Sequence, residues 1–520
     1  MTESNRWSAS HYRFAAATLT ILAAILYTYR LGKTSLWTDE SASFVFARLS
    51  WHDLGVAVRS RDVFFTGYYS LLHLWMSFGS NEAVLRMPSV IAAVIALPCM
   101  YALGSRMFGP RAGLVAMMLL GSNNLFILHV REARPYAWLV LVAILSSLMF
   151  LRVLDSRKPS DVAWYVAASV FGIYVHIFAF LVPISHGVSL VFFPGKRPWK
   201  PFVFALAAIT AMMVPLLILT SGEESASGCD FAGHGNPRDL IYFFRIFCGS
   251  KTSAVLYAAL GAGVYLRYRL QRSRAVGKGD LPLGHTLVDP DAYSYAFLLC
   301  WMLVPPCVTL VVSHFVPLFK EIYLLVSLSP LLLLVAATLA SIRDARIVVV
   351  ATLLFVTLNI PGALKTYQDH GEKEDWRGAI AAVTEGARSH DALMILPATD
   401  TTVLAYYERN LAPRNLPSVV YPDDSAYLLW FSAPTANLPH KLIVDAFTSL
   451  PACSTSAPPL RLSRIRTVVH QYARVWMIVD QDVPTSAVQA ESLAHMLADR
   501  FKLVKVEPFT RVVVKLYERA

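Results

Sequence analysis

The sequence predicts a mainly α-helical membrane protein of about eleven transmembrane helices, followed by a soluble α/β domain. The 520 residues are 56% hydrophobic and only 16% charged, with a mean hydropathy of +0.49, whereas soluble proteins are about a quarter charged. Apolar stretches long enough to cross a bilayer recur as far as Leu364, and beyond Lys365 they shorten to strand length. This composition argues against a cytosolic globular enzyme and against a disordered chain.

A membrane-spanning helix needs roughly 17 to 25 mostly apolar residues. The stretches that we interpret as spans are Phe14–Tyr29, Ala83–Leu103, Ala112–Leu128, Pro135–Leu151, Val162–Val175, Ile177–Phe193, Phe202–Thr220, Ser253–Leu266, Tyr293–Phe315, Ile322–Ala340 and Ile347–Leu364. The fifth, sixth and eighth are short or poorly bounded. No small-residue cleavage site follows the first stretch, which favours a retained helix over a cleaved signal peptide.

The distribution of charge predicts the topology. With a cytoplasmic N-terminus, the segments assigned to the cytoplasm hold 17 Lys/Arg against 7 Asp/Glu, whereas the opposite segments before Lys365 have a net charge of only +1. This asymmetry obeys the positive-inside rule. An odd number of spans then places the C-terminal domain outside, so the formal net charge of +11 reflects topology and not a nucleic-acid-binding surface.

Residues 365–520 form the second predicted domain, after a transmembrane domain of residues 1–364. Strand-length apolar runs occur at Ala392–Leu396, Leu442–Val444, Val475–Val479 and Val512–Leu516, and helical patterns occur at Trp376–Ala387 and Ala487–Phe501. The domain carries 17 Lys/Arg and 17 Asp/Glu. Its charge balance gives no indication of nucleic-acid binding.

A pair of adjacent acids, Asp39 and Glu40, lies in the long first outer loop, residues 30–82. Apolar and aromatic residues flank the pair about ten residues beyond the first span. A carboxylate that is partly desolvated near a bilayer surface becomes more basic, and it can accept a proton from an attacking hydroxyl or amine. The alternative is that Asp39 caps a short helix that begins at Glu40, and the two roles can coexist.

These motifs resemble the bacterial members of the protein-mannosyltransferase-like superfamily, which are integral membrane glycosyltransferases of the GT-C fold. The matching motifs are Trp37-x-Asp39-Glu40-Ser, Asp62-Val, Tyr68-Tyr69-x-Leu-Leu-His73-x-Trp75, Phe108-Gly-x-Arg111, Arg131-Glu132-Ala-Arg134-Pro-Tyr136, Glu321-x-Tyr323 and Asp375-Trp376-Arg377. The likeness is concentrated in residues 30–140. Beyond about residue 385 the chain resembles no family that we can name.

The resemblance implies transfer of a sugar from a polyprenyl-phosphate carrier to an acceptor at the periplasmic face of the bacterial inner membrane. It assigns Asp39 as general base or acceptor-orienting group, Glu40 as its support and Asp62 as a second acid of the same cavity. An inverting single displacement is expected. The resemblance does not distinguish between a glycan, a lipid and a protein as acceptor. It assigns no metal ligands, although a divalent cation is possible as cofactor.

The resemblance also implies a substrate-binding set, which consists of Tyr68, Tyr69, His73, Arg131, Arg134, Lys320 and Tyr323. A phosphate leaving group needs cations or aimed N–H donors; Arg86 and Arg245 are further candidates on the outer side. The alternative for Arg131 and Arg134 is that they extend to lipid phosphates, as arginines near span ends do.

The sequence departs from the family pattern at two places. The stretch 64–67 reads Phe-Phe-Thr-Gly where the family has His-Pro-Pro-Leu, which removes an imidazole and two rigid prolines and predicts a more flexible loop. Ile322 stands where the family commonly has an arginine, a natural phosphate ligand. Lys320 lies two residues away.

The outer segment 221–251 contains Cys229 and Cys248, for which we predict a disulfide because the compartment is oxidising. The Cys, His and Asp residues of this segment match no zinc-binding spacing. The amphipathic stretch Pro237–Phe247 predicts an interfacial helix near the entrance for the lipid substrate.

Two other functions are compatible with the topology: a secondary transporter or lipid flippase, and a noncatalytic relative of the fold. Transporters often contain paired repeats with broken helices, and the sequence has no internal repeat. It also has no P-loop and no GxGxxG motif, so a nucleotide-sugar donor is not indicated.

Overall fold

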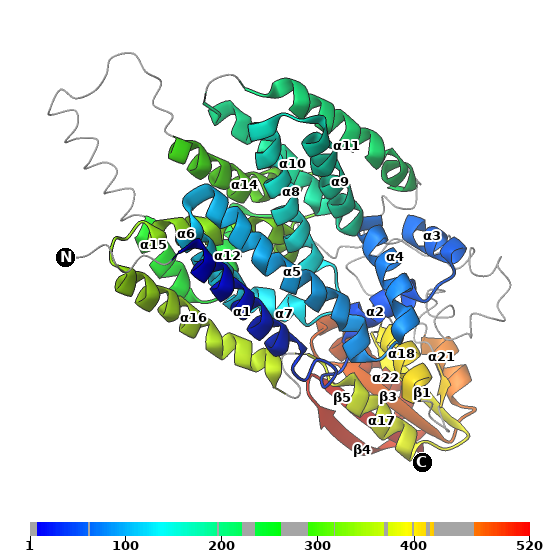
Figure 1. The fold of residues 1–520 in the computed structure, drawn as a ribbon. Helices are drawn as coiled ribbons and strands as arrows, with labels where there is room; N and C mark the ends of the chain where they lie inside the picture. Colours follow the sequence, from blue (N-terminus) through cyan, green and yellow to red (C-terminus); the bar gives the residue numbers. More distant parts are fainter. Residues whose placement is uncertain are drawn as a thin grey trace, which may run out of the picture.

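The computed structural model describes residues 8–60, 63–194, 197–220, 235–261, 290–316, 318–368, 373–397, 400–411, 417–420 and 462–520. The chain first builds a body of packed helices. A small sheet with its own helices then lies against one end of that body (Figure 1). The predicted combination of apolar helices followed by an α/β part is confirmed.

Seven helical segments among the described residues are long and apolar enough to cross a membrane. They are α1 (Ala9–Thr28), α5 (Glu82–Phe108), α8 (Tyr136–Ser156), α11 (Trp199–Thr220), α14 (Pro290–Val312), the pair η5 (Glu321–Ser327) and α15 (Leu328–Ala340), and α16 (Ala345–Tyr367). The bent pair α6 (Pro110–Ser122) and α7 (Asn124–Val130), with an angle of 62°, would make an eighth.

The predicted count of eleven spans is therefore not confirmed. Three predicted spans are not among these helices. The helix α9 (Pro159–Val175) has 17 residues, which is at the lower limit for a span. The run Ile177–Phe192 is divided into η3 (Ile177–Phe180), α10 (Leu181–Ser189) and η4 (Leu190–Phe192). Residues 251–261 are helical, and the rest of that predicted span lies outside the described residues.

The first outer loop is largely helical. It contains α2 (Thr38–Ala47), α3 (Trp51–Ser60), η1 (Val63–Phe65), α4 (Thr66–Trp75) and η2 (Met76–Phe78). The amphipathic helix predicted at Pro237–Phe247 is present as α12, with the same bounds, and is capped by Asn236 together with Asp239. These short helices lie between the long apolar ones in the chain and supply most of the site described below.

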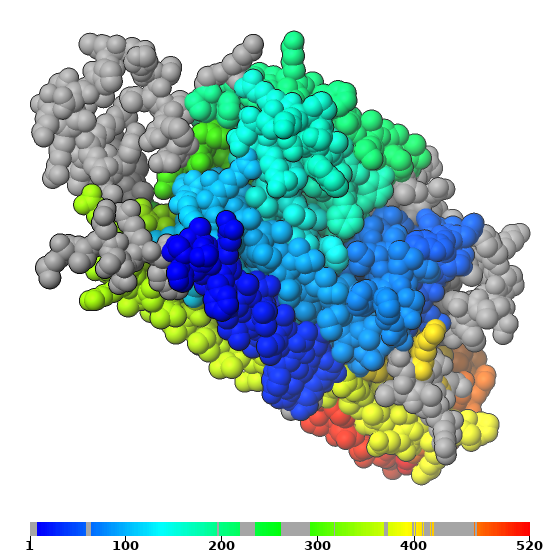
Figure 2. All heavy atoms as spheres, viewed as in Figure 1, coloured from blue at the N-terminus to red at the C-terminus, as the bar shows by residue number. Residues whose placement is uncertain are grey.

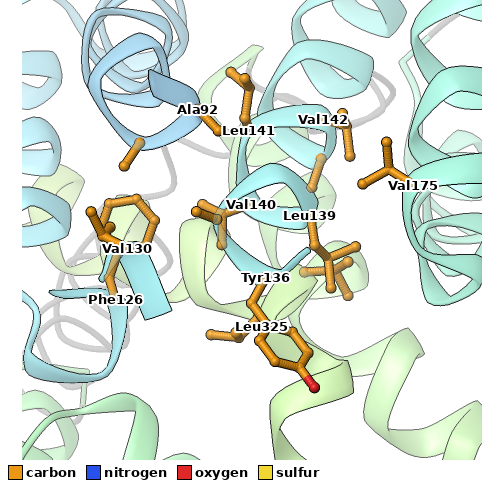
Figure 3. Packing of buried hydrophobic residues seen from close by; sticks show 14 of the residues in the cluster. Ala92, Phe126, Val130, Tyr136, Leu139, Val140, Leu141, Val142, Val175 and Leu325 are labelled. Atoms are coloured by element: carbon orange, nitrogen blue, oxygen red, sulfur yellow. The ribbon is translucent and has the colours of Figure 1, made fainter. Parts of the chain in front are cut away.

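The helix α8 forms the centre of the helical body. Tyr136, Leu139 and Val140 of α8 pack among residues of α5, α7, α9 and η5 (Figure 3). In contrast, only 6% of the apolar stretch of α1 is buried, and this helix lies along the surface in Figure 2. A helix that is apolar all round but not covered by protein is suited to contact with lipid.

The C-terminal domain contains a five-stranded sheet in the order β2-β1-β3-β5-β4. Its strands are β1 (Asp391–Leu396), β2 (Ser418–Val419), β3 (Arg474–Asp480), β4 (Phe501–Phe509) and β5 (Val512–Arg519). The pairs β2–β1 and β1–β3 are parallel, and β5 pairs antiparallel with β3 and β4. The accompanying helices are α17 (Trp376–Gly386), α18 (Thr401–Leu411), α21 (Leu462–Val469) and α22 (Pro484–Leu497).

Three of the predicted strand runs coincide with β1, β3 and β5. The strands β1 and β3 are buried along their whole length, and their apolar runs are continuous. In β5, buried and partly buried positions alternate over the first four residues. The pattern missed β4, whose residues are mostly exposed, because an exposed edge strand has no apolar run. The predicted run Leu442–Val444 lies outside the described residues.

Candidate active site

The loops alternate between two ends of the helical body, as the charge pattern predicts. At one end the first outer loop meets residues 131–134 and the C-terminal domain. At the other end Arg106 pairs with Asp155, and Arg111 donates a hydrogen bond to the carbonyl of Asp344 at 3.3 Å. The grouping of the loops agrees with the predicted topology. Which end faces outside stays a prediction.

Asp39 lies in the first turn of α2 and remains partly open. Its side chain is 34% exposed, and its Oδ2 is 3.6 Å from Nη2 of Arg134. The helix begins at Thr38, with Trp37 as N-cap residue and no side-chain cap. The alternative that Asp39 caps a helix starting at Glu40 is therefore wrong, and its carboxylate is available for other partners.

Glu40, the next residue, is completely buried and fully engaged. Arg86 of α5 donates to both carboxylate oxygens, at 2.7 and 2.8 Å. The backbone N–H of Ala133 donates at 2.8 Å and Lys373 at 3.1 Å. Burial alone would raise the pKa of the Glu40 carboxyl, but Arg86 and Lys373 lower it below its ordinary value. Glu40 is an anchor that positions α2; its role as support of a catalytic Asp39 stays a prediction.

Arg86 fixes the chain that leads to Asp39. Besides the two bonds to Glu40, its guanidinium donates to the carbonyls of Leu31 at 2.8 Å, Thr34 at 3.0 Å and Ser35 at 2.8 Å. Its side chain is fully buried. The donors of Arg86 are thus committed to protein acceptors. This argues against the prediction that Arg86 is a candidate ligand of the phosphate.

Lys373 joins the acids of two different segments. Its ammonium lies 3.1 Å from Glu40 and 3.3 Å from Glu132, and Glu132 also accepts from Nδ1 of His129 at 2.8 Å. Burial would raise the pKa of Glu132, but Lys373 and His129 lower it to about 2. The sequence did not predict Lys373 as a site residue. The Asp375-Trp376-Arg377 motif, which begins two residues later, was the feature of the sequence that drew attention to this segment.

Arg134 is the buried cation beside Asp39, and it is held loosely. Its Nη2 is 3.4 Å from the hydroxyl of Tyr136, and its guanidinium lies over the rings of Phe65 and Tyr136 at 5.0 and 5.6 Å. Its Nε has no hydrogen-bond partner among the described residues. A buried guanidinium with an unused donor can accept an additional anionic partner.

Arg131 has a different environment from Arg134. It donates to the carbonyls of Tyr27 at 3.0 Å and Tyr29 at 2.8 Å, and it lies over the ring of Tyr367 at 4.3 Å. The last carbonyls of a helix lack intrahelical partners and attract cations. Arg131 thus completes the end of α1, which leaves Arg134 as the better candidate for a substrate anion.

An aromatic cluster forms one wall beside Arg134. The ring centroid of Phe65 lies 4.9 Å from that of His176, 6.1 Å from that of Tyr69 and 6.3 Å from that of Tyr323. Lys320 lies over the ring of Tyr323 at 5.7 Å. The stretch 64–67, which was expected to be a flexible loop, forms η1 and the start of α4, and Phe65 is buried in the cluster.

The remaining predicted site residues differ in their surroundings, and some lie outside the described residues. Tyr68 is fully buried. His73 is hydrogen-bonded through Nδ1 to the carbonyl of Ala47 at 2.7 Å and packs against Trp51, so it supports α2. Asp62 and Cys229 lie outside the described residues, and Cys248 is buried. The second acid and the disulfide therefore stay predictions.

The C-terminal domain holds the first outer loop at several points. Arg377 of α17 donates to Glu82 at 2.6 Å and to the carbonyls of Gly32 and Lys33 at 3.1 and 3.0 Å. Thr38 of α2 donates to Asp400 at 2.8 Å. Figure 2 shows the yellow and red residues of the domain against the blue residues of the loop. The position of Asp39 therefore depends on both parts of the chain.

A C-terminal α/β domain thus covers the first outer loop, which carries Asp39 and Glu40, at one end of a body of apolar helices. This arrangement is that of a polytopic membrane protein. Residues 68–219 match the family model of dolichyl-phosphate-mannose-protein mannosyltransferases. The predicted resemblance to GT-C membrane glycosyltransferases is thus confirmed at the level of the fold.

Solved structures of ArnT from Cupriavidus metallidurans are similar to the chain. The apo structure is 13% identical in sequence, covers 98% of each chain and has a TM-score of 0.59. The structure bound to undecaprenyl phosphate is 12% identical, covers 98% of each chain and has a TM-score of 0.58. No curated protein sequence matches the chain.

Proposed function

We propose that this protein is a glycosyltransferase that moves a sugar from a polyprenyl-phosphate carrier to an acceptor at the outer face of the bacterial inner membrane. The observation that carries the proposal is the pair formed by the partly exposed Asp39 and the buried, loosely held Arg134. A general base and a phosphate-binding cation are the two groups that such a transfer needs. A solved structure of the same fold holds undecaprenyl phosphate.

The proposed reaction is a single inverting displacement. A hydroxyl or amine of the acceptor attacks the anomeric carbon and forms the new glycosidic bond, while the bond between that carbon and the phosphate oxygen breaks. Asp39 takes the proton of the acceptor, and the negative charge leaves on the polyprenyl phosphate. Arg134 stabilises that phosphate, with Lys320 as a second cation. Asp62 retains its proposed role as a second acid.

The buried network around Glu40 supports this assignment because it determines where Asp39 lies. Glu40 is bound by Arg86 of α5, by the backbone of Ala133 and by Lys373 of the C-terminal domain. A catalytic group must be held in place by neighbours that are themselves fixed. The network thus supplies a rigid support directly beside the one acid of the pair that remains partly exposed.

Transfer of labelled sugar from purified polyprenyl-phosphate donors tests the proposal. Asp39→Asn should lower the rate by roughly 10²- to 10⁴-fold, which is the usual contribution of a general base. The matched control is Asp53→Asn in α3 of the same loop. Equal thermal stability of both variants would show that the loss is chemical. Full activity of Asp39→Asn would refute the assignment of Asp39.

The same assay separates the proposal from its rivals. A flippase would move the intact lipid-linked sugar between leaflets without breaking the bond to phosphate, and a noncatalytic relative would do neither. Analysis of the lipid fraction in detergent, where no leaflets exist, should show release of the free polyprenyl phosphate. A panel of hexosyl and pentosyl donors with glycan, lipid and peptide acceptors would then identify the substrates.

A further inference from the structure

A second group of acids lies at the edge of the sheet in the C-terminal domain. Asp480 ends β3, Asp482 follows two residues later, and Asp400 follows the end of β1 by four residues. The strands β1 and β3 are parallel neighbours, with β2 on one side and β5 on the other. The carboxyl ends of two such strands, where the connections diverge, are the usual ligand-binding position of an α/β sheet.

The acids converge on one small volume. Glu374, Asp480 and Asp482 each offer a carboxylate oxygen, and these oxygens all lie within 4.8 Å of one another. Glu374 is 8% exposed and Asp480 3%. Asp400, which is 2% exposed, lies close enough to Asp480 for the two carboxylates to interact electrostatically. The group therefore brings together four carboxylates, three of which are buried.

Two of these carboxylates each have one oxygen that accepts no hydrogen bond from the described residues. Oε2 of Glu374 and Oδ2 of Asp400 are buried without a hydrogen-bond partner among the described residues. A buried, unpartnered carboxylate oxygen is costly, and proteins normally compensate it with a donor, a proton or a cation. These two oxygens point to a ligand that completes the site.

The cations nearby are already engaged. Arg511 donates to Oδ2 of Asp482 at 2.6 Å, at the exposed edge of the group. Lys373 adjoins Glu374 in sequence, but its ammonium is bound by Glu40 and Glu132. The protein itself thus leaves an excess of negative charge at this edge.

We infer that Glu374, Asp480 and Asp482, with Asp400 beside them, form a binding site for a hard divalent cation such as Ca²⁺. Ligands that are exclusively carboxylate oxygens suit Ca²⁺ and Mg²⁺. Oxygens that lie within 4.8 Å of one another can ligate a single ion. Ca²⁺ accepts a set of ligands made of protein oxygens more readily than Mg²⁺, which usually keeps several waters.

The site connects the sheet to the loop that carries Asp39. The other oxygen of Asp400, Oδ1, accepts a hydrogen bond at 2.8 Å from Thr38, the residue before Asp39. Glu374 follows Lys373, which contacts Glu40, the residue after Asp39. A cation bound here neutralises the acids and stabilises the contact of the domain with the start of α2. Its role is structural, and it is independent of the reaction proposed above.

Metal binding by the full-length protein in detergent tests the inference without an activity assay. The protein is first treated with EDTA and then titrated with CaCl₂ or MgCl₂ at pH 7.5, with calorimetry and thermal unfolding as readouts. Ca²⁺ should bind and raise the melting temperature, and Mg²⁺ should bind at least several-fold more weakly. Glu374→Gln and Asp480→Asn should each reduce the affinity for Ca²⁺ at least tenfold.

Two variants make the experiment decisive. Glu491→Gln removes an exposed carboxylate from α22 of the same domain and should leave Ca²⁺ binding unchanged. If a buried variant does not fold, Asp482→Asn, at the exposed edge of the site, takes its place. The inference is overturned if the native protein binds neither ion, or if the site variants bind Ca²⁺ as tightly as Glu491→Gln does.

Discussion

Asp39 and Glu40 are neighbours in sequence, yet the structure gives them opposite environments. The side chain of Asp39 is 34% exposed with one cation at 3.6 Å, whereas that of Glu40 is fully buried among Arg86, Ala133 and Lys373. Successive residues of a helix point about 100° apart, so one faces the site and the other faces the protein. The pair thus divides into a reactive group and a fixed support.

Glu40→Gln should destabilise the protein far more than Asp39→Asn does. Removal of one charge from a buried network leaves the opposite charges unpaired, which costs about 3–5 kcal/mol. Thermal unfolding in detergent should therefore show a clearly lowered melting temperature for Glu40→Gln and little change for Asp39→Asn. Similar melting temperatures for the two variants would contradict the anchoring role of Glu40.

Glu132 should make the stability of the protein depend on acid pH. Its folded-state pKa of about 2 lies below the ordinary value of 4.5, so its contribution is complete above pH 4.5 and is lost as the pH falls toward 2. The shift corresponds to a free energy on the order of 3 kcal/mol. Glu132→Gln should melt below the native protein at pH 7, and the difference should shrink between pH 4.5 and pH 3.

The pKa of Glu40 is also lowered, so Glu40 contributes to the acid dependence of the native protein as well. Because Glu40 is present in both proteins, the difference in melting temperature between native protein and Glu132→Gln reports on Glu132. A difference in melting temperature that stays constant or grows on acidification would show that Glu132 is not the group responsible.

At the scale of the elements, α4 and α9 approach each other closely at Gly67. A Cβ atom on Gly67 would lie 2.6 Å from the carbonyl oxygen of Tyr174 and 3.0 Å from the backbone nitrogen of Val175. Backbone atoms cannot move aside as a flexible side chain can. Gly67, which stands where the family pattern has leucine, therefore permits α4 to pack directly on α9.

Gly67→Ala should accordingly destabilise the protein by about 1–3 kcal/mol, the usual cost of overpacking. Gly55→Ala is the matched control, since a Cβ there would meet nothing within 4 Å; it should leave stability unchanged or raise it by about 0.5–1 kcal/mol. Melting temperatures in detergent check both. Equal effects of the two substitutions would argue against the close contact between α4 and α9.

Sequence patterns predicted those elements whose signal is local. Length and hydropathy predicted α1, α5 and α8, and amphipathicity predicted α12. In contrast, the division of residues 177–192 into three short helices depends on packing and leaves no periodic signal. Lys373 shows the same limitation at the site, because its partner Glu40 is 333 residues away in sequence, and no spacing rule connects residues at such a distance.

For the whole molecule, the charge asymmetry predicts that the end carrying Asp39 faces outside. Alkaline phosphatase fused after Ala520 should be active, because this enzyme needs the oxidising exterior, and the same fusion placed after Arg157 should be inactive. Activity should be normalised to the amount of fusion protein. The opposite pattern of activities would reverse the predicted topology and would place the proposed reaction on the cytoplasmic side.

The attachment of the domain to the helical body should depend strongly on Arg377. Its guanidinium donates to Glu82 and to three carbonyls of the first outer loop, a geometry that lysine cannot reproduce. Arg377→Lys should therefore accelerate proteolytic cleavage of the loop several-fold in limited digestion. Arg466→Lys, at an exposed ion pair of α21, should digest at the native rate. Equal digestion of both variants would show that Arg377 does not hold the loop.

The contacts of Lys373 and Arg377 also have a consequence for biosynthesis. The loop with Asp39 is synthesised early, but Lys373 follows Glu40 by 333 residues and Arg377 follows Glu82 by 295. Until then Glu40 lacks its lysine and Glu82 lacks its arginine. The helical body is thus synthesised before the first outer loop can adopt its final geometry, so the site is complete only after residue 377 has been made.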